Sequence, residues 1–425
     1  MLLATLLTAG FTIALGLVFA IPLSLYGYLK RDHNGLGLFA FATLWVLSEW
    51  FRGWFLTGFP WLFLGYGFID TGLAGWAPLT GVCGLSGLVA CSGAVIGRAL
   101  LRADPPRITA IAVILLAATW WGGGQLQKLS WTIPASNTPL TVALVQPNQA
   151  VLTKWHENAL PVILADIREK TLTLRNHNLV IFPESGIPAL KNSVDDFLTE
   201  LDSAATYQQT AVITGIPMQS NAGNYFNGVI GLGLATGSYQ KRRLVPFGEY
   251  LPFEHWLRGL IAFFDLPMSS FSAGADQQAL IEVGPFDGAT FGVATAVCYE
   301  IAYSDQMAAD ARQANLLLTV SNDTWFGDSL GPHQHLQIAR ARALENGKPL
   351  IRVTNDGITA IIDERGNVLN QLPRFRPDIL RGEVMPRGGA TPYSRTGSVP
   401  LIVVCLVGFL LALALSRRRI TETPM

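Results

Sequence analysis

The feature that most constrains this chain is a set of long stretches without a single charged side chain. Residues 1–29, 76–97 and 397–416 contain no Asp, Glu, Lys or Arg. Over the whole chain only 14% of residues are charged, whereas typical soluble proteins have about 25%. An apolar segment of about 20 residues can cross a bilayer, because a helix satisfies its own backbone hydrogen bonds. The pattern predicts a membrane protein with a water-exposed domain in its middle part.

Five segments have the length and composition of membrane spans, the second being the shortest and the fourth marginal. They are residues 2–28, 36–51, 76–98, 107–123 and 397–416. We therefore expect an α-helical transmembrane bundle, with about four spans in residues 1–125 and a closing span at 397–416. An α/β domain is expected at 137–395, and a short basic tail at 417–425.

The basic residues between these segments predict the side on which the domain lies. Lys and Arg collect on the cytoplasmic side of bacterial membranes. The clusters at 30–31, 98–107 and 417–419 share one side if the first span runs from outside to inside. The domain is then expected in the periplasm of a bacterial inner-membrane protein, with the basic tail in the cytoplasm. Met1 would lie outside without a signal sequence, so we expect further spans upstream of this sequence.

The domain alternates apolar, strand-like runs with helical patterns, which favours a layered α/β fold. Three of the runs end in polar residues, at Glu184, Cys298 and Asn322. Sites in such folds form at the ends of strands. We therefore expect Glu184 and Cys298 to converge at the ends of neighbouring strands.

Cys298 is the only cysteine of the domain, and it directly follows an apolar strand in ATAVCYEIAY. A thiol with a pKa of about 8.5 needs a base before it can act as a nucleophile. Glu184 could be that base. Lys241 could stabilise an oxyanion together with the backbone N–H of Tyr299. Three alternatives remain open: Cys298 as a core residue, Glu184 at a helix start, and Lys241 in a solvated basic run.

The segments FPES, KRRLVPFGEY and AVCYE, in that order, resemble the Glu–Lys–Cys signature of the nitrilase, or carbon–nitrogen hydrolase, superfamily. The segments FRGWFLTGFPW, SNDTWFG and TPYSRTG are similar to the apolipoprotein N-acyltransferase family within it. The resemblance extends over nearly the whole chain, and the family has more spans than these five. It implies a nitrilase-like αββα sandwich outside the cytoplasm.

The resemblance also implies roles for individual residues. Cys298 would be the acylated nucleophile, Glu184 the general base and Lys241 the cation beside the oxyanion. The supporting residues would be Glu249, Tyr299 and Glu300, and Trp155 would lie near the substrate entrance. Phe263 and Phe264 belong to an apolar loop that either lines an acyl chain or forms a core helix.

The implied reaction is a ping-pong acyl transfer without a cofactor. The donor would be a phospholipid, with phosphatidylethanolamine expected, and the acceptor the diacylglyceryl-cysteine of an apolipoprotein. A second interpretation is a membrane-anchored amidase or nitrilase that hydrolyses a small amide. A third is an inactive, truncated homologue that acts as a scaffold.

Other motifs argue against further functions. His333 and His335 in GPHQH could bind a metal, but no carboxylate or cysteine is spaced to complete the site, so no metal is expected. The glycine-rich run at 231–237 lacks the spacing of a nucleotide-binding loop. The net charge is zero and there is no basic stripe, so nucleic acid is not expected as a partner.

Overall fold

The computed structural model describes residues 2–29, 36–246, 248–250 and 271–420. The chain divides into two compact units. The first comprises Met1–Leu129 and Thr396–Met425, and the second comprises Ser130–Arg395.

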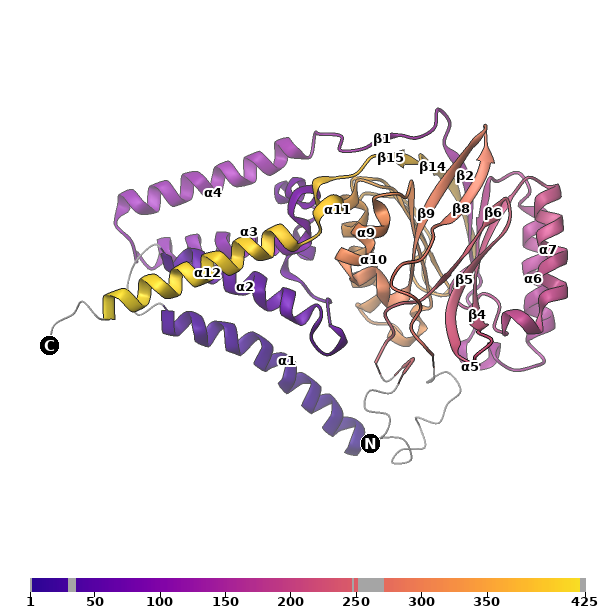
Figure 1. Ribbon diagram of the computed structural model, residues 1–425, viewed down its shortest axis with the longest axis horizontal. Coiled ribbons are helices and arrows are strands. Elements are labelled where there is room, and N and C mark those ends of the chain that lie inside the picture. The colour runs from indigo at the N-terminus through magenta and orange to yellow at the C-terminus, as the bar shows by residue number, and fades with distance from the viewer. Residues whose placement is uncertain (1, 30–35, 247, 251–270, 421–425) are drawn as a thin grey trace. The chain divides into compact units, whose positions relative to one another are not determined.

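The first unit is helical (Figure 1). Its long helices are α1 (Leu2–Leu29), α2 (Leu36–Arg52), α3 (Ala77–Leu100), α4 (Pro106–Leu126) and α12 (Val399–Ile420), with short 3-10 turns η1 (Phe55–Thr57), η2 (Leu64–Phe68) and η3 (Gly72–Trp76) between α2 and α3. Among the described residues, three segments are long and apolar enough to cross a membrane: Thr8–Gly27, Gly72–Leu100 and Pro106–Leu126. The second expected span is shorter, since α2 has 17 residues, and the apolar part of α12 covers only Val399–Ala414.

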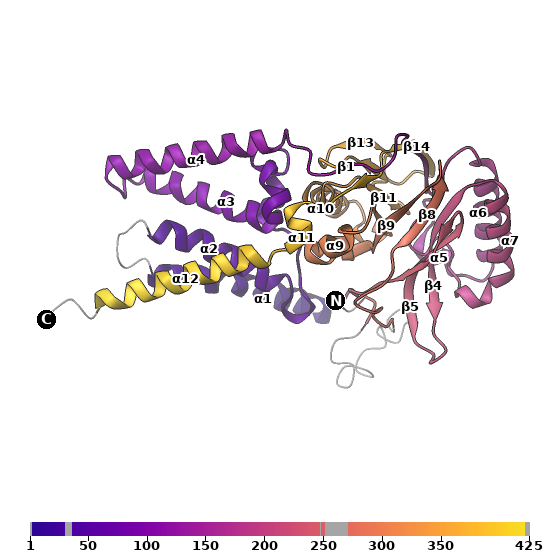
Figure 2. The same ribbon diagram turned by 45° about the horizontal axis from the view of Figure 1, so that its top comes forward.

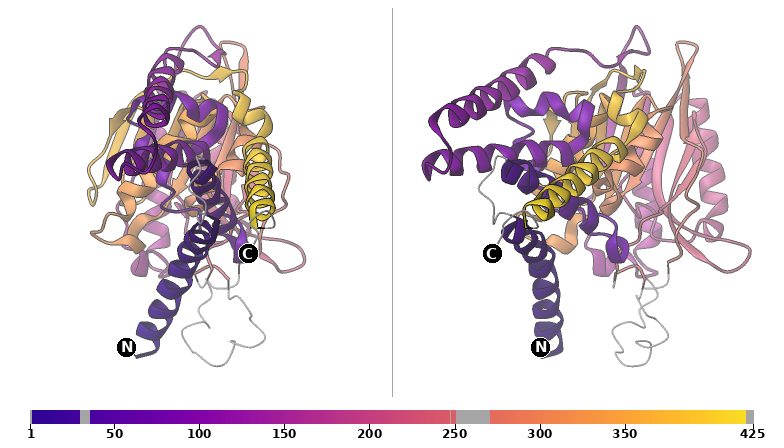
Figure 3. Two further views of the ribbon diagram at one scale, coloured as in Figure 1. Left: turned by 90° about the vertical axis from the view of Figure 1, so that its left-hand side faces the viewer. Right: turned by 60° about the vertical axis from the view of Figure 1, so that its left-hand side comes forward.

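The helical unit carries its apolar side chains on the outside. Ile114 of α4 is 66% exposed and Leu410 of α12 is 61% exposed. Soluble proteins rarely expose apolar surface of this extent. Within the unit, α2 packs against α12 (Figure 3). Val46 of α2 forms a small buried cluster with Ile402 and Cys405 of α12. This distribution agrees with a helix bundle that lies in lipid.

The second unit consists of two β-sheets between two pairs of helices (Figure 2). The six-stranded sheet has the order β14-β2-β3-β4-β5-β7, and the seven-stranded sheet has the order β13-β12-β11-β10-β9-β8-β6. The first sheet contains β2 (Leu140–Gln146), β3 (Leu179–Ile181), β4 (Ala211–Gln219), β5 (Tyr225–Gly233), β7 (Ser238–Gln240) and β14 (Asp378–Val384). The second contains β6 (Ala235–Thr236), β8 (Ile281–Phe286), β9 (Ala289–Val297), β10 (Leu316–Ser321), β11 (Leu350–Thr354), β12 (Ala360–Ile362) and β13 (Val368–Gln371). A separate two-stranded pair joins β1 (Ile133–Pro134) to β15 (Arg387–Gly388).

Helices cover the outer faces of both sheets. On one side lie α6 (Leu160–Thr173) and α7 (Asp195–Tyr207), and on the other α9 (Ser304–Ala311) and α10 (Gly331–Asn346). Shorter helical segments are α5 (Val151–Lys154), η4 (Lys191–Ser193), η7 (Cys298–Ala302), η8 (Asp323–Phe326) and α11 (Pro392–Thr396). The largest apolar cluster lies between the inner faces of the two sheets and includes Leu144, Ile213 and Val297. The αββα sandwich implied by the family resemblance is confirmed.

The strand register decides where the polar strand ends meet. Strands β9, β10 and β11 run parallel, with Val297 opposite Val320 and Ser321 opposite Thr354. Cys298 therefore follows β9 next to the end of β10. Glu184 follows β3 in the other sheet. The expectation of neighbouring strands is wrong: Glu184 and Cys298 approach each other from different sheets, because the sandwich stacks the two parallel cores face to face.

Candidate active site

Cys298 is the first residue after β9 and adopts a left-handed backbone conformation with φ of +53°. Non-glycine residues avoid this region, at a cost on the order of 1–3 kcal/mol, and often adopt it where a side chain must be aimed. The short 3-10 turn η7 begins at this position. The Cys298 side chain is half-buried and hydrogen bonds to Ser321 at the end of the adjacent strand β10. Cys298 thus packs against the apolar cluster between the sheets and also meets this polar strand end.

Glu184 lies in a turn after β3 and not at a helix start. One carboxylate oxygen accepts a 2.8 Å hydrogen bond from the backbone N–H of Asn322, which follows β10. The other oxygen accepts a 2.8 Å hydrogen bond from the side-chain amide of Asn227 on β5. The carboxylate therefore bridges the two sheets.

Lys241 is only 1% exposed, so the interpretation of the basic run as solvated surface is wrong for this residue. Its Nζ lies 2.8 Å from Glu249 and 4.0 Å from Oε1 of Glu184. A buried ammonium is stable only when it is paired in this way. The adjacent Arg242 forms an ion pair with Asp310 instead.

The electrostatics of the three groups are coupled. Burial raises the pKa of Glu184, although the charge of Lys241 opposes this effect. Burial alone would lower the pKa of Lys241, but the charges of Glu249 and Glu184 outweigh it and raise the pKa above its ordinary value. Burial and the Glu184 charge raise the pKa of Cys298 to about 12, while Lys241 opposes the shift. The site thus combines a neutral thiol, a permanent cation and a carboxylate with raised proton affinity.

Glu300 holds the turn that carries the cysteine. Its side chain is fully buried and accepts hydrogen bonds from the backbone N–H groups of Val297 (2.9 Å), Arg242 (2.7 Å) and Arg243 (3.0 Å). It also accepts a 2.9 Å hydrogen bond from the Tyr239 hydroxyl. This one carboxylate therefore ties the segment after Lys241 to the segment before Cys298.

The other site residues expected from the sequence are two separate aromatic residues, Tyr299 and Trp155, and the pair Phe263 and Phe264. The ring of Tyr299 packs edge-on against Tyr303 at 5.6 Å between centroids. Trp155 ends the short helix α5, and its buried indole Nε1 has no hydrogen-bond partner among the described residues. Phe263 and Phe264 lie outside the described residues.

Lys154 is a residue of the site that the sequence did not reveal. It is 4% exposed, and its ammonium donates a 3.2 Å hydrogen bond to the carbonyl of Ser185. Burial lowers its pKa to about 8, and the charge of Glu184 is the main opposing effect. In the sequence, Lys154 is marked only by its position directly before Trp155, the residue expected near the substrate entrance.

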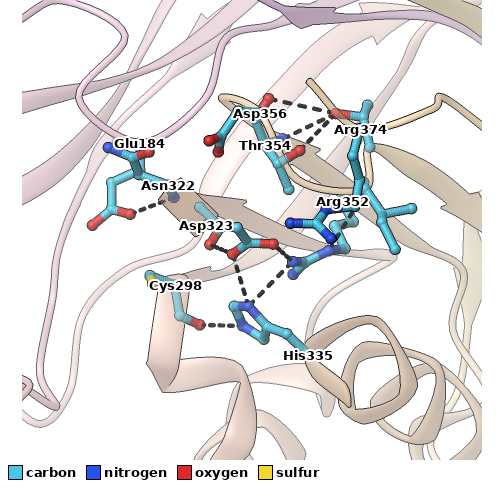
Figure 4. A network of polar contacts seen from close by, with 12 residues as sticks. Glu184, Cys298, Asn322, Asp323, His335, Arg352, Thr354, Asp356 and Arg374 are labelled. Carbon is cyan, nitrogen blue, oxygen red and sulfur yellow. Dashed lines mark hydrogen bonds and ion pairs between the residues drawn. The ribbon is translucent and has the colours of Figure 1, made fainter. Parts of the chain in front are cut away.

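Beneath Cys298 lies a second polar network, formed by Asp323, His335 and Arg352 (Figure 4). Burial is outweighed by the charge of Arg352 together with the hydrogen bond from Ser321, which hold the pKa of Asp323 well below its usual range. Among the described residues, no three His, Cys, Asp or Glu side chains are grouped so that they could hold a metal ion. His335 nevertheless meets a carboxylate, which the spacing in the sequence did not predict.

Comparison with known proteins gives two family matches. The carbon–nitrogen hydrolase family matches residues 141–393, and the apolipoprotein N-acyltransferase N-terminal domain matches residues 1–95. The apolipoprotein N-acyltransferase of Pseudomonas syringae pv. tomato is 42% identical over 99% of this chain and 83% of its own length. That of Azotobacter vinelandii is 44% identical over 98% of this chain and 81% of its own.

Solved structures show a more distant likeness. An amidase from Nesterenkonia sp. is 20% identical, covers 63% of this chain and 97% of its own, and has a TM-score of 0.45.

Proposed function

Because this chain belongs to the apolipoprotein N-acyltransferase family, we propose that it transfers a fatty acyl group from a phospholipid to the N-terminal diacylglyceryl-cysteine of apolipoproteins. The observation that carries the proposal is the shared environment of three groups: the Lys241 ammonium lies 4.0 Å from Glu184 in a buried site, and the charges of both residues act on the pKa of Cys298. A base, a cation and a thiol are the set that acyl transfer through a thioester requires.

In the first half-reaction, Glu184 accepts the proton of the Cys298 thiol as the sulfur attacks the ester carbonyl of the donor. The resulting oxyanion is stabilised by the Lys241 ammonium and by the backbone N–H of Tyr299. When the carbon–oxygen bond breaks, Glu184 returns the proton to the leaving oxygen, and a lysophospholipid departs. The acyl group stays on the sulfur as a thioester.

In the second half-reaction, the α-amine of the acceptor attacks the thioester, and Glu184 accepts a proton from the nitrogen. The carbon–sulfur bond breaks, and the proton passes to the Cys298 sulfur. The products are an amide on the acceptor and the free thiol. Glu249 fixes the Lys241 ammonium throughout, and Glu300 fixes the turn that carries the nucleophile.

The supporting residues extend this assignment. Trp155 is proposed to contact substrate, because its buried indole N–H has no partner among the described residues and lies next to Lys154. Phosphatidylethanolamine is the proposed donor, and Phe263 and Phe264 are proposed to contact its acyl chain on the basis of the sequence.

The domain between residues 137 and 395 is proposed to lie in the periplasm, because Lys and Arg flank the opposite ends of the spans. Protease treatment of spheroplasts tests that orientation, since a periplasmic domain is digested without lysis.

The acyl-enzyme provides the direct test. The detergent-purified chain and its Cys298→Ala variant are incubated with phosphatidylethanolamine, and their intact masses are measured. We expect a gain of one fatty acyl group that hydroxylamine removes and that the variant lacks. If no adduct forms while small amides are hydrolysed, the chain is an amidase and the proposal is wrong.

A further inference from the structure

His335, on α10, is the residue of the GPHQH motif that the proposed chemistry leaves unexplained. Its side chain is completely buried, and its Nε2 lies 3.1 Å from the backbone carbonyl oxygen of Cys298. A carbonyl oxygen can only accept a hydrogen bond. Nε2 therefore carries a hydrogen and donates a hydrogen bond to the backbone carbonyl of the nucleophile.

The far side of the imidazole is fixed by a buried ion pair. His335 Nδ1 lies 3.0 Å from the Asp323 carboxylate and 3.1 Å from the guanidinium of Arg352. The Arg352 guanidinium is 2.5 Å from Asp323 and also donates to the carbonyl of Ile358. Ser321 donates a 2.7 Å hydrogen bond to the same carboxylate. The ring is thus held from both sides (Figure 4).

The carbonyl that His335 holds belongs to the same peptide plane as the N–H of Tyr299. In a planar trans peptide the C=O and the following N–H point in opposite directions. Fixing the carbonyl of Cys298 toward His335 therefore fixes the Tyr299 N–H on the opposite side of the plane. Cys298 sits in the left-handed region at φ of +53°, so this peptide has a strained conformation from which it can relax.

We propose that His335 is a positioning residue for the oxyanion site: by holding the Cys298 carbonyl it aims the Tyr299 N–H at the developing oxyanion. The imidazole itself touches no substrate and transfers no proton. The inference rests on the proposed role of Cys298 as the nucleophile. It adds to that role an explanation of how the peptide between Cys298 and Tyr299 keeps one orientation.

Two probes separate this role from simple packing. Acylation by 4-nitrophenyl butyrate passes through an oxyanion and needs the aligned N–H. Alkylation by iodoacetamide displaces iodide at a saturated carbon and forms no oxyanion. A misdirected peptide should slow the first reaction and leave the second nearly unchanged.

The experiment uses the full chain in detergent, with His335→Ala, His335→Gln and the matched control His333→Gln, an exposed histidine of the same helix. For His335→Ala we expect the acylation rate to fall about 10- to 100-fold, with KM changed less than about twofold. Alkylation of Cys298 should change less than about threefold. His335→Gln can still donate an N–H and should recover part of the loss, and His333→Gln should match the wild type.

Several results would overturn the inference. One is a folded His335→Ala that acylates at the wild-type rate, and another is a parallel loss of acylation and alkylation. If His335→Ala does not fold, as judged from its tryptophan fluorescence melting curve, His335→Gln decides. A partial loss of acylation with nearly unchanged alkylation supports the role, and either wild-type acylation or an equal loss of both reactions refutes it. A wild type that reacts with the nitrophenyl ester but not with phospholipid would refute the proposed function and still test His335.

Discussion

The carboxylates of Glu184 and Glu249 share one amide group: Asn227 Nδ2 lies 2.8 Å from an oxygen of Glu184 and 2.9 Å from an oxygen of Glu249. Lys241 is the cation between them. Lys154 is a second cation whose charge acts on Glu184. A proton that moves from Cys298 to Glu184 shifts the negative charge from that carboxylate to the sulfur, where the charge of Lys241 stabilises it; this is the step that the proposed mechanism requires.

Replacing the shared amide should disable the base. In Asn227→Leu both carboxylates lose a donor in a buried site, which costs about 1–3 kcal/mol for each unsatisfied group. We expect the rate of acyl-enzyme formation to fall about 10- to 100-fold. The acid limb of the pH–rate profile should move to higher pH, because the loss of the donor raises the pKa of Glu184. Rates of acylation between pH 5 and 9 measure both effects. Asn224→Leu, on the exposed end of the same hairpin, serves as the control, and equal profiles for the two variants would contradict the assignment.

Lys154 should tune the base from the other side. Its charge lowers the pKa of Glu184, against the larger effect of burial. In Lys154→Met the pKa of Glu184 therefore rises, and we expect acylation at pH 6 to fall about 3- to 10-fold. The wild-type lysine has a pKa of about 8, so it loses its charge above that pH and the two rates should converge near pH 9. A constant ratio across the pH range, or the same effect in exposed Lys191→Met, would refute the electrostatic explanation.

The free enzyme should contain a neutral thiol. Because burial and the charge of Glu184 raise the pKa of Cys298 to about 12, the thiolate fraction grows with pH throughout the range from 7 to 10. We expect the rate of iodoacetamide alkylation, mapped to Cys298 by peptide mass spectrometry, to rise about tenfold for each pH unit. Glu184→Gln removes the negative charge that raises the pKa of Cys298. This variant should react faster with iodoacetamide, while it loses acylation because the general base is absent. A rate that is already constant at pH 7 would show a preformed thiolate instead.

The turn that carries Glu184 should not tolerate a methyl group on the strand behind it. A Cβ at Gly215 would lie 2.5 Å from the backbone nitrogen of Ser185 and 2.8 Å from the Cα of Glu184. Gly215→Ala must therefore push the base out of position, with a loss of about 1–3 kcal/mol of stability and a clear drop in acylation. At Gly228 the first contact is the flexible end of Met218, so Gly228→Ala is the milder comparison. Melting curves and acylation rates of both variants check the contrast.

Much of the architecture could be predicted from local patterns. Long uncharged apolar stretches indicated the helical segments, because the requirement to satisfy the backbone in lipid acts along the chain itself. The Asn355-Asp356-Gly357 segment has the composition of a hairpin turn, and the strands on either side of it, β11 and β12, pair antiparallel. Strand ends followed by polar residues indicated Glu184 and Cys298, since the end of a continuous apolar run shows where the buried part of a strand stops.

The partners of these residues depended on the tertiary structure. Asn227 and His335 carry no local signal, because an asparagine in a strand and a histidine in a helix have many ordinary uses. Lys241 stands in a basic run, and only its burial between the carboxylates distinguishes it from a surface lysine. The sequence by itself determined which segments form long apolar helices and which strands are followed by polar residues, since both follow from hydropathy over a few neighbouring residues. Which atoms meet was decided by the stacking of two sheets, because that packing joins residues more than 100 positions apart, such as Glu184 and Asn322.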